Sequence, residues 1–372
     1  MSIDQNRIKF ESQNKDQKAF FSTLTKRVNK YFKDRNLSKK ANTEMVIKTI
    51  TMILLYVLPF AILLIFQPPF WSALILWTLM GLGMSGIGMN IMHDAIHGAF
   101  SNNKKVNELM GYTLNLVGGA RFNWYLQHNV LHHTYTNIDQ WDEDINGKGA
   151  IKLSPHSDLK WFQRPQWLYA VFVYGILTLY WVVAKDFVQF VKYTKNGMNK
   201  NSTLQNISIM TRIILLKAVY LFVFLVLPVW VFNIPFYQVL TGFLLMHFIA
   251  GVVLTVVFQL AHSVEETTHP LPNEEGNIEN AWAIHQMETT VNFARDNKFL
   301  NWYLGGLNFQ VEHHLLPHIC HVHYPQIAPI VKETAEEFGV PYLEHETVTG
   351  AVKSHFNLLR VYGLPDLDEA IV

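Results

Sequence analysis

The chain has 372 residues, half of them apolar and only 16% charged, whereas charged residues make up about 25% of a typical soluble protein. This composition favours an integral membrane protein, and the formal net charge of +1 argues against a nucleic-acid-binding protein. A single cysteine, Cys320, excludes disulfides within the chain, cysteine zinc sites and iron–sulfur clusters.

Two apolar stretches follow a polar N-terminal segment, residues 1–44, which lacks the short apolar core of a signal peptide. Residues 45–66 contain one lysine, Lys48, and residues 71–92 contain no charged residue. As a helix, each stretch would extend about 33 Å, enough to cross the apolar core of a bilayer. Two prolines in the connecting segment predict a tight turn, so we expect a helical hairpin.

Residues 213–232 and 236–261 form a second such pair, with a hinge at Asn233–Pro235. Lys217 lies one turn inside the third span, 213–232, and from there its ammonium is expected to reach towards the membrane surface. The apolar segment 167–190 contains Lys185 and Asp186, which favours a helix in the plane of the membrane. A soluble bundle is the alternative, but the length of the spans and the uncharged hairpin tips disfavour it.

Basic residues predict the orientation of the spans. Twelve lie in residues 1–48, twelve in residues 104–212 and five after His262, whereas neither hairpin tip carries any. Both termini and the long middle segment are therefore expected in the cytoplasm. The predicted fold is an all-α integral membrane protein, with four transmembrane helices in two hairpins and a cytoplasmic helical cap within residues 45–372.

Histidine occurs 17 times, and three clusters fall on the predicted cytoplasmic side. Residues four apart on a helix share a face, so several of these histidines form aligned pairs. A further histidine, His262, ends the fourth span on the same side. The clusters are His93-Asp94-Ala95-Ile96-His97, His128-Asn129-Val130-Leu131-His132-His133 and Gln310-Val311-Glu312-His313-His314.

Eight histidines on one side of a membrane indicate metal binding, although an isolated histidine on an apolar helix is more often a hydrogen-bonded core residue. Imidazole suits zinc, copper, iron and nickel, and one zinc takes only three or four ligands. Eight donors therefore favour two ions, and two redox ions indicate activation of dioxygen, for which iron is the common choice. The neighbouring Asp94, Asn129 and Glu312 either orient these imidazoles or are solvated residues at helix ends.

The remaining histidines are interpreted as ordinary structural residues. His247 precedes His262 by fifteen residues, about 22 Å along a helix, so it cannot reach the same ions. The glycine pattern Gly81–Gly86 follows no strand, which favours close helix packing over dinucleotide binding. The other ordinary histidines are His156, His269, His285, His318, His321, His323, His345 and His355.

The three clusters resemble the histidine boxes of the membrane fatty acyl desaturases, and the match extends from about residue 45 to residue 341. HDAIH, HNVLHH and QVEHH fit the family's pattern of HxxxH, HxxHH or HxxxHH, and HxxHH or QxxHH. Gln310 and the surrounding Asn301–Pro317 resemble the front-end subgroup, which inserts a double bond between the carboxyl end and an existing double bond. The resemblance implies an oxygen-dependent desaturase with two iron ions bound by His93, His97, His128, His132, His133, His262, His313 and His314.

Two departures from the family pattern bear on this reading. No His-Pro-Gly-Gly haem motif occurs, and residues 1–40 are too short for a fused haem domain, so we expect a separate electron-transfer protein. Acyl-CoA desaturases carry an asparagine that holds a metal-bound water one turn before the fourth-span histidine. Phe258 occupies that position here, and Gln259 or Gln310 is the candidate to compensate.

Two other functions remain open from the residues alone. A hydroxylase or ketolase of the same histidine-box type would share the metal site. A non-enzymatic membrane haem or zinc protein would use fewer ligands, because haem needs only one or two. For the desaturase we expect dioxygen, the bilayer and an acyl-CoA or acyl-lipid substrate in an apolar tunnel as partners, and no nucleic acid.

Overall fold

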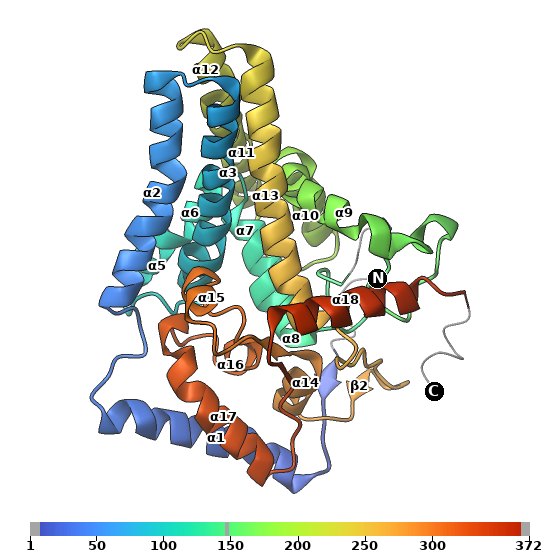
Figure 1. Cartoon of the computed structure of the whole chain (residues 1–372). Helices are drawn as coiled ribbons and strands as arrows, with labels where there is room; N and C mark the ends of the chain where they lie inside the picture. Colours follow the sequence, from blue (N-terminus) through green and yellow to red (C-terminus); the bar gives the residue numbers. More distant parts are fainter. Residues whose placement is uncertain (1–7, 146–148, 366–372) are drawn as a thin grey trace.

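The computed structural model describes residues 8–145 and 149–365, and these residues are mainly helical (Figure 1). The all-α expectation misses only two short parallel strand pairs. β1 (Lys9–Phe10) pairs with β2 (Asn277–Ile278), and β3 (Asn292–Phe293) pairs with β4 (Glu344–His345). Both pairs connect segments far apart in the sequence at the lower end of the molecule.

The first long hairpin consists of α2 (Thr43–Phe66) and a helix that runs from Phe70 to Ile96. The second helix contains α3 (Phe70–Gly86), a π-helical segment (Ile87–Met92) and α4 (His93–Ile96). Gln67 ends α2 in the left-handed region, with φ 43°. A Cβ atom on Gly83 would lie 2.6 Å from the backbone nitrogen of Tyr56, so the glycine lets the two helices touch.

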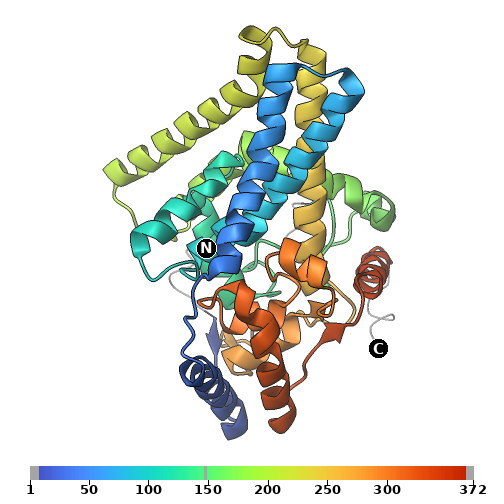
Figure 2. The same ribbon diagram turned by 60° about the vertical axis from the view of Figure 1, so that its left-hand side comes forward.

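The second hairpin begins ten residues earlier than expected, at residue 203 rather than 213. It contains α11 (Thr203–Leu221), a π-helical segment (Phe222–Val226), α12 (Leu227–Trp230) and α13 (Phe236–His262). Ser202 caps α11 through the backbone N–H of Gln205, which sets the earlier start. Figure 2 shows α11 slanting away from the bundle, whereas α13 runs through it.

Lys217 does not reach towards the membrane surface, contrary to expectation. Its side chain is buried, forms an ion pair with Asp186 at 2.7 Å and donates to the carbonyl oxygens of Gly118 and Trp181. A lysine inside an apolar helix needs acceptors, and here the acceptors are supplied by the protein interior. Lys48 is likewise buried, and its Nζ lies 2.6 Å from Nε2 of His321.

Within residues 8–145 and 149–365, five helices are long and apolar enough to cross a membrane. Four contain the expected spans, and the fifth is Gln166–Lys195, which the sequence assigned to the membrane plane. This helix contains α9 (Gln166–Tyr180), a π-helical segment (Trp181–Lys185) and α10 (Asp186–Lys195). It packs closely on α13, and the approach depends on glycine. A Cβ atom on Gly251 would lie only 2.6 Å from the carbonyl oxygen of Gly175.

Shorter helices cover the lower ends of α4 and α13 in Figure 1. The N-terminal α1 (Lys15–Asp34) packs against α17 (Tyr324–Glu337) and α14 (Trp282–Thr289) through Phe20, Leu24, Val28 and Phe32. α1 therefore contributes to the core formed by these shorter helices. The others are α5 (Lys104–Gly111), α6 (Thr113–Leu116), α7 (Arg121–Trp124), α8 (His133–Tyr135), α15 (Lys298–Tyr303), α16 (Gln310–Leu315), α18 (Val348–Tyr362) and two 3₁₀ turns (Trp161–Gln163 and His321–His323).

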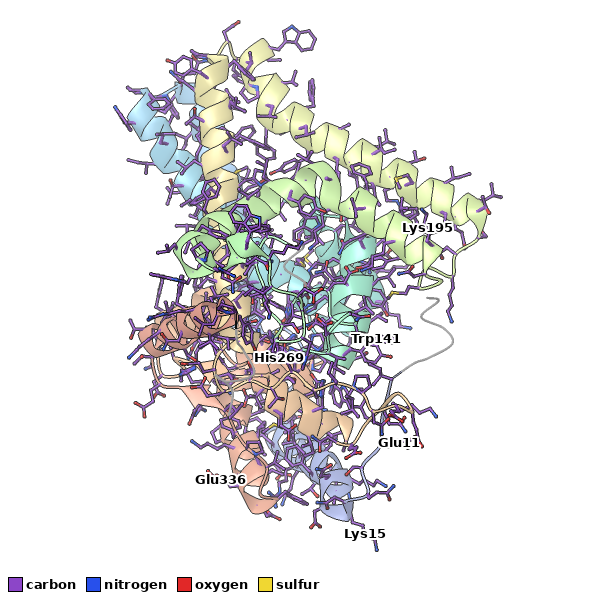
Figure 3. The ribbon with its side chains drawn as sticks, turned by 90° about the vertical axis from the view of Figure 1, so that its right-hand side faces the viewer. Glu11, Lys15, Trp141, Lys195, His269 and Glu336 are labelled. Carbon is purple, nitrogen blue, oxygen red and sulfur yellow. The ribbon has the colours of Figure 1, made fainter. Side chains whose placement is uncertain are left out.

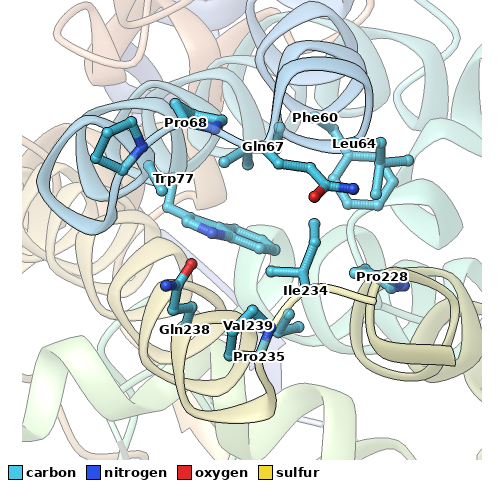
Figure 4. Close-up of a pocket in the computed structure, with 13 residues that line it drawn as sticks. Phe60, Leu64, Gln67, Pro68, Trp77, Pro228, Ile234, Pro235, Gln238 and Val239 are labelled. Carbon is cyan, nitrogen blue, oxygen red and sulfur yellow. The ribbon is translucent and has the colours of Figure 1, made fainter. Parts of the chain in front are cut away.

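A cavity of about 250 Å³ lies between the tips of the two hairpins. Figure 4 shows Phe60, Trp77 and Ile234 around it, with prolines of both connecting turns at its rim. The histidine clusters lie at the opposite ends of α3 and α13, so this cavity is remote from them.

Candidate metal centre

The eight expected ligands come together at the lower ends of the two long hairpins. His93 begins α4, His97 follows it and His262 ends α13. His128 and His132 lie in a π-helical segment (Tyr125–His132). His133 begins α8, while His313 and His314 lie in α16. Seven of the eight side chains are buried and His97 is half-buried.

The imidazole nitrogens form two main groups joined by a third. Within each group the donor atoms lie within 4.8 Å of one another. Nε2 of His128 is 3.1 Å from Nε2 of His93 and 3.2 Å from that of His133. The two main groups are His93, His97, His128, His313 and His132, His262, His314, and the joining group is His133, His313, His314.

Four of these imidazoles share a bonding pattern typical of metal ligands. In each, Nδ1 faces a protein oxygen, whereas Nε2 is buried and has no hydrogen-bond partner among the described residues. An outward Nδ1–H fixes the ring and leaves the Nε2 lone pair directed inwards. The Nδ1 contacts are His132 to Asp142 Oδ2 (3.0 Å), His262 to Thr289 O (3.2 Å), His313 to the Tyr324 hydroxyl (3.2 Å) and His314 to Gln286 Oε1 (2.7 Å).

The electrostatics of the site also suit metal binding. Burial, reinforced by neighbouring imidazoles, holds the pKa values of His128, His133, His313 and His314 well below the usual value. Neutral imidazoles keep the lone pair that a metal requires. For His132, burial lowers the pKa, but the Asp142 carboxylate outweighs this effect and the net shift is upward. The residues present therefore fit two transition-metal ions with nitrogen donors.

The family follows from comparison with known proteins. A sequence model of the fatty acid desaturase family matches residues 69–346. The chain belongs to this family. It is 37% identical to sn-1 linoleoyl-lipid 6-desaturase of Arthrospira platensis over 95% of both chains. It is 35% identical to the enzyme of the same name from Synechocystis sp., over 96% of this chain and 98% of that one.

A third relative is the acyl-lipid (8-3)-desaturase of Physcomitrium patens, 32% identical over 96% of this chain and 73% of the relative. The protein is thus a fatty acid desaturase, an oxidoreductase that introduces a double bond into an acyl chain. The family match and the named relatives therefore favour a desaturase over a hydroxylase and over a non-enzymatic metal-binding protein.

The sequence suggested that Asp94 and Glu312 either orient ligand imidazoles or lie solvated at helix ends. The structure shows neither role for these two carboxylates. Asp94 is buried and accepts from Nδ1 of His321 at 2.9 Å. Glu312 is buried and accepts from the hydroxyl of Tyr342 at 2.7 Å. Neither carboxylate is solvated, and neither forms a hydrogen bond with an expected ligand. The half-buried Asn129 donates to the carbonyl oxygen of Ile96 at 3.2 Å, which supports the turn before His97.

The residues that orient the ligands lie elsewhere, and sequence reasoning missed them. Asp142 belongs to the segment Trp141–Asp144, and Gln286 lies in α14. Asp142 is buried and also accepts from the backbone N–H of Asn137 at 3.0 Å. The only signal in the sequence is an acidic cluster ten residues after a histidine box, which on its own is typical of a solvated loop.

Gln310 lies at the site, as expected. It begins α16, is 2% exposed, and its Oε1 has no hydrogen-bond partner in the described part of the chain. Gln310 and Gln259 line a cavity of about 160 Å³ that also reaches His93 and His128. The ring of Phe258 lies 4.9 Å from that of His132 and 4.8 Å from that of His262, so an apolar wall stands at this position.

The histidines interpreted as ordinary lie outside the two main groups. His247 contacts the hydroxyls of Tyr220 and Thr178 at 3.0 and 3.1 Å. His321 does approach two other potential donors, Asp94 and Cys320. Both of its ring nitrogens are already engaged, one by Asp94 and the other by Lys48, so this cluster offers no free position for a metal.

We expect Asp142→Asn to weaken metal binding about tenfold to a hundredfold. The new amide can donate to Nδ1 of His132, which would place the ring proton on Nε2 and remove the inward lone pair. Metal analysis of the purified protein at graded metal concentrations measures the effect. Asp139→Asn is the control, because in the described part of the chain Asp139 accepts a hydrogen bond from Ser157 at 3.3 Å and contacts no proposed ligand. Equal metal affinities for the two variants would contradict the assigned role of Asp142.

Proposed function

We propose that the protein is a front-end acyl-lipid desaturase whose eight clustered histidines hold two iron ions. The observation that carries the proposal is the set of buried Nε2 atoms that lack a hydrogen-bond partner among the described residues and belong to the histidine groups. Burying an imidazole nitrogen without a partner costs free energy, and metal binding offsets that cost. Iron bound there supplies the oxidising power, with dioxygen, to remove hydrogen from an unactivated methylene.

The protein's own residues would position the chain and exclude water. His93 and His128 form one wall of the 160 Å³ cavity, and Met84, Met89 and Leu254 line its apolar part. A methylene held against the imidazole wall is already oriented for reaction, so the entropic part of the barrier is smaller. Gln310 faces the same cavity and is placed to hydrogen-bond a ligand of the metal ions.

The substrate class is proposed from the relatives and from the position of the cavity. Two relatives are named as linoleoyl-lipid desaturases and a third as an acyl-lipid desaturase. A second cavity of about 490 Å³ shares Leu177 and Thr255 with the first, and lies between α9 and α13. An acyl lipid would enter from the bilayer beside the apolar face of α9. Electrons would come from a separate electron-transfer protein.

We also propose four membrane spans, with residues 1–44 and the whole cap in the cytoplasm and the desaturase unit in residues 45–372. The fifth long helix would lie at the membrane surface. Its middle part, with Leu177, Trp181 and Lys185, lines the cavity that reaches His93 at the end of α3. This proximity of its middle part to the histidines supports a position at the membrane surface.

Topology reporters test this arrangement. Fusions at Lys40 and Val372 and an insertion at Gly197 should all report cytoplasm, whereas an insertion at Asn233 should report the opposite side. If Gln166–Lys195 crosses the membrane instead, the two termini will lie on opposite sides, and the four-span proposal is wrong.

Expression in a host supplied with defined fatty acids tests the function. We expect a new double bond on the carboxyl side of an existing one, together with two iron ions per chain. His132→Ala should abolish the product and lower the iron content, because a buried ligand is lost. His318→Ala is the control, since His318 is exposed three residues beyond α16. Mass spectrometry locates the double bond, and a hydroxylated product or an active His132→Ala enzyme would refute the proposal.

Gln310 allows a finer test of the front-end assignment. Gln310→Ala should lose most activity but less iron than His314→Ala, because an amide is a weaker donor than imidazole. Gln310→His, which restores an imidazole, should retain measurable activity. Gln326→Ala, an exposed glutamine in α17, serves as the control. Wild-type activity in Gln310→Ala would reduce the residue to a structural amide.

A further inference from the structure

One buried charge in the substrate cavities has no role in the site described so far. Lys185 ends the π-helical segment between α9 and α10 and is 6% exposed. It lines both the cavity of about 160 Å³ that reaches the histidines and the neighbouring cavity of about 490 Å³. Gln127, Gln259 and the carboxylate of Asp144 also line both. Lys185 therefore stands at the junction between the two cavities.

The Lys185 ammonium has no protein acceptor among the described residues. Its Nζ lies over the ring of Trp181, 4.6 Å from the ring centre. The acidic groups nearby form their hydrogen bonds and ion pairs with other side chains, although Asp144 also attracts the Lys185 ammonium electrostatically. Asp186 pairs with Lys217, Asp144 accepts from the Gln127 amide, and Glu143 accepts from Lys192 and Tyr193.

An ammonium in a largely apolar cavity costs free energy unless oxygen acceptors surround it. The three hydrogens of a lysine ammonium can donate to a carbonyl, ester or carboxylate oxygen. The neighbouring surfaces are suited to the rest of an acyl lipid. Apolar Val173, Ile176 and Leu177 line the outer cavity, and apolar Met84 and Met89 line the inner one.

We propose that Lys185 binds the carbonyl oxygen of the acyl group at this junction. The carbons next to the carbonyl then occupy the inner cavity in front of His93 and His128, and the rest of the chain continues towards Met84 and Gly88. The methionines can change rotamer as the chain enters. Lys185 is thus a positioning residue that sets the number of carbons between the carbonyl and the new double bond. The inference rests on the proposed function.

The geometry of the inner cavity supports this direction of binding. The same small cavity is lined by Lys185 and by the histidines His93 and His128, so only a short stretch of chain separates the carbonyl from the metal ligands. A reaction site a few carbons from the carbonyl is what front-end desaturation requires. A carbonyl held far from the histidines would instead place the double bond nearer the methyl end.

The test compares a linoleoyl glycerolipid ester with its alkyl-ether analogue, which lacks only the carbonyl oxygen. The wild-type enzyme should have a kcat/KM at least tenfold higher for the ester, because a hydrogen bond to a charged donor contributes that much. Lys185→Met should lower the ester value towards the ether value, leave the ether value nearly unchanged, and produce double bonds at more than one position. Lys185→Arg should restore much of the ester preference.

Lys195→Met is the matched control, because Lys195 is an exposed lysine at the far end of α10, on the outside of the molecule (Figure 3). Lys195→Met should match the wild type in its kcat/KM for the ester, in its kcat/KM for the ether and in the position of the new double bond. Offering linoleoyl-CoA to the same variants distinguishes a thioester carbonyl from a lipid ester carbonyl. Dependence on Lys185 only with the lipid identifies the lipid as the carrier.

The outcomes separate this inference from the proposed function. An iron-loaded wild-type enzyme that makes no double bond overturns the proposed function. An active wild-type enzyme with equal kcat/KM for ester and ether overturns the role of Lys185, even if Lys185→Met does not fold. An ester preference and a single bond position that survive in folded Lys185→Met overturn it as well.

Discussion

The convergence of imidazole nitrogens in a buried space is the constraint on which the rest of the structure depends. Each Nε2 atom that lacks a protein partner costs free energy when it is buried, and each of the eight clustered histidine rings has the centre of another within 5 Å of its own. Other groups of the protein must therefore fix each ring through a hydrogen bond at its second nitrogen, Nδ1. Asp142, Thr289, Tyr324 and Gln286 do so through Nδ1, and they come from three separate segments of the chain, because Gln286 and Thr289 both lie in α14.

Buried charges join the long apolar helices to the cap in the same way. Lys48 on α2 contacts His321, and His321 in turn contacts Asp94, the residue after a proposed ligand. Lys217 on α11 pairs with Asp186 on α10. A buried charge pair adds little net stability but strongly disfavours arrangements that leave either charge unpaired. These contacts thus select one placement of the helices around the histidines.

The features that could be predicted from the sequence are those set by its local pattern. The long apolar runs and the spacing of histidines within each box need no knowledge of the fold, and all eight expected ligands lie in the grouped nitrogens. Partners supplied by tertiary contact could not be predicted. Lys217 was expected at the membrane surface because its acceptor Asp186 lies 31 positions away. Asp142 and Gln286 were missed because an acid in a loop and an amide in a short helix have many ordinary explanations.

The sharing of histidines between groups shows a similar limit. Helical spacing pairs His128 with His132, and the two share a group with Asp144, yet His128 also joins His93 and His97, whereas His132 also joins His262 and His314. The two rings remain stacked, with centres 5.2 Å apart, so one short segment supplies donors to both groups. Phe258 packs against the second group, while Gln259 and Gln310 face the cavity beside the first. The two groups therefore differ in their surroundings: Phe258 packs as an apolar wall on the rings of the second group, and the first group meets amides and the cavity proposed for the substrate, which Phe258 also lines. An oxidising centre needs both features, since the wall excludes water and the open side admits the chain.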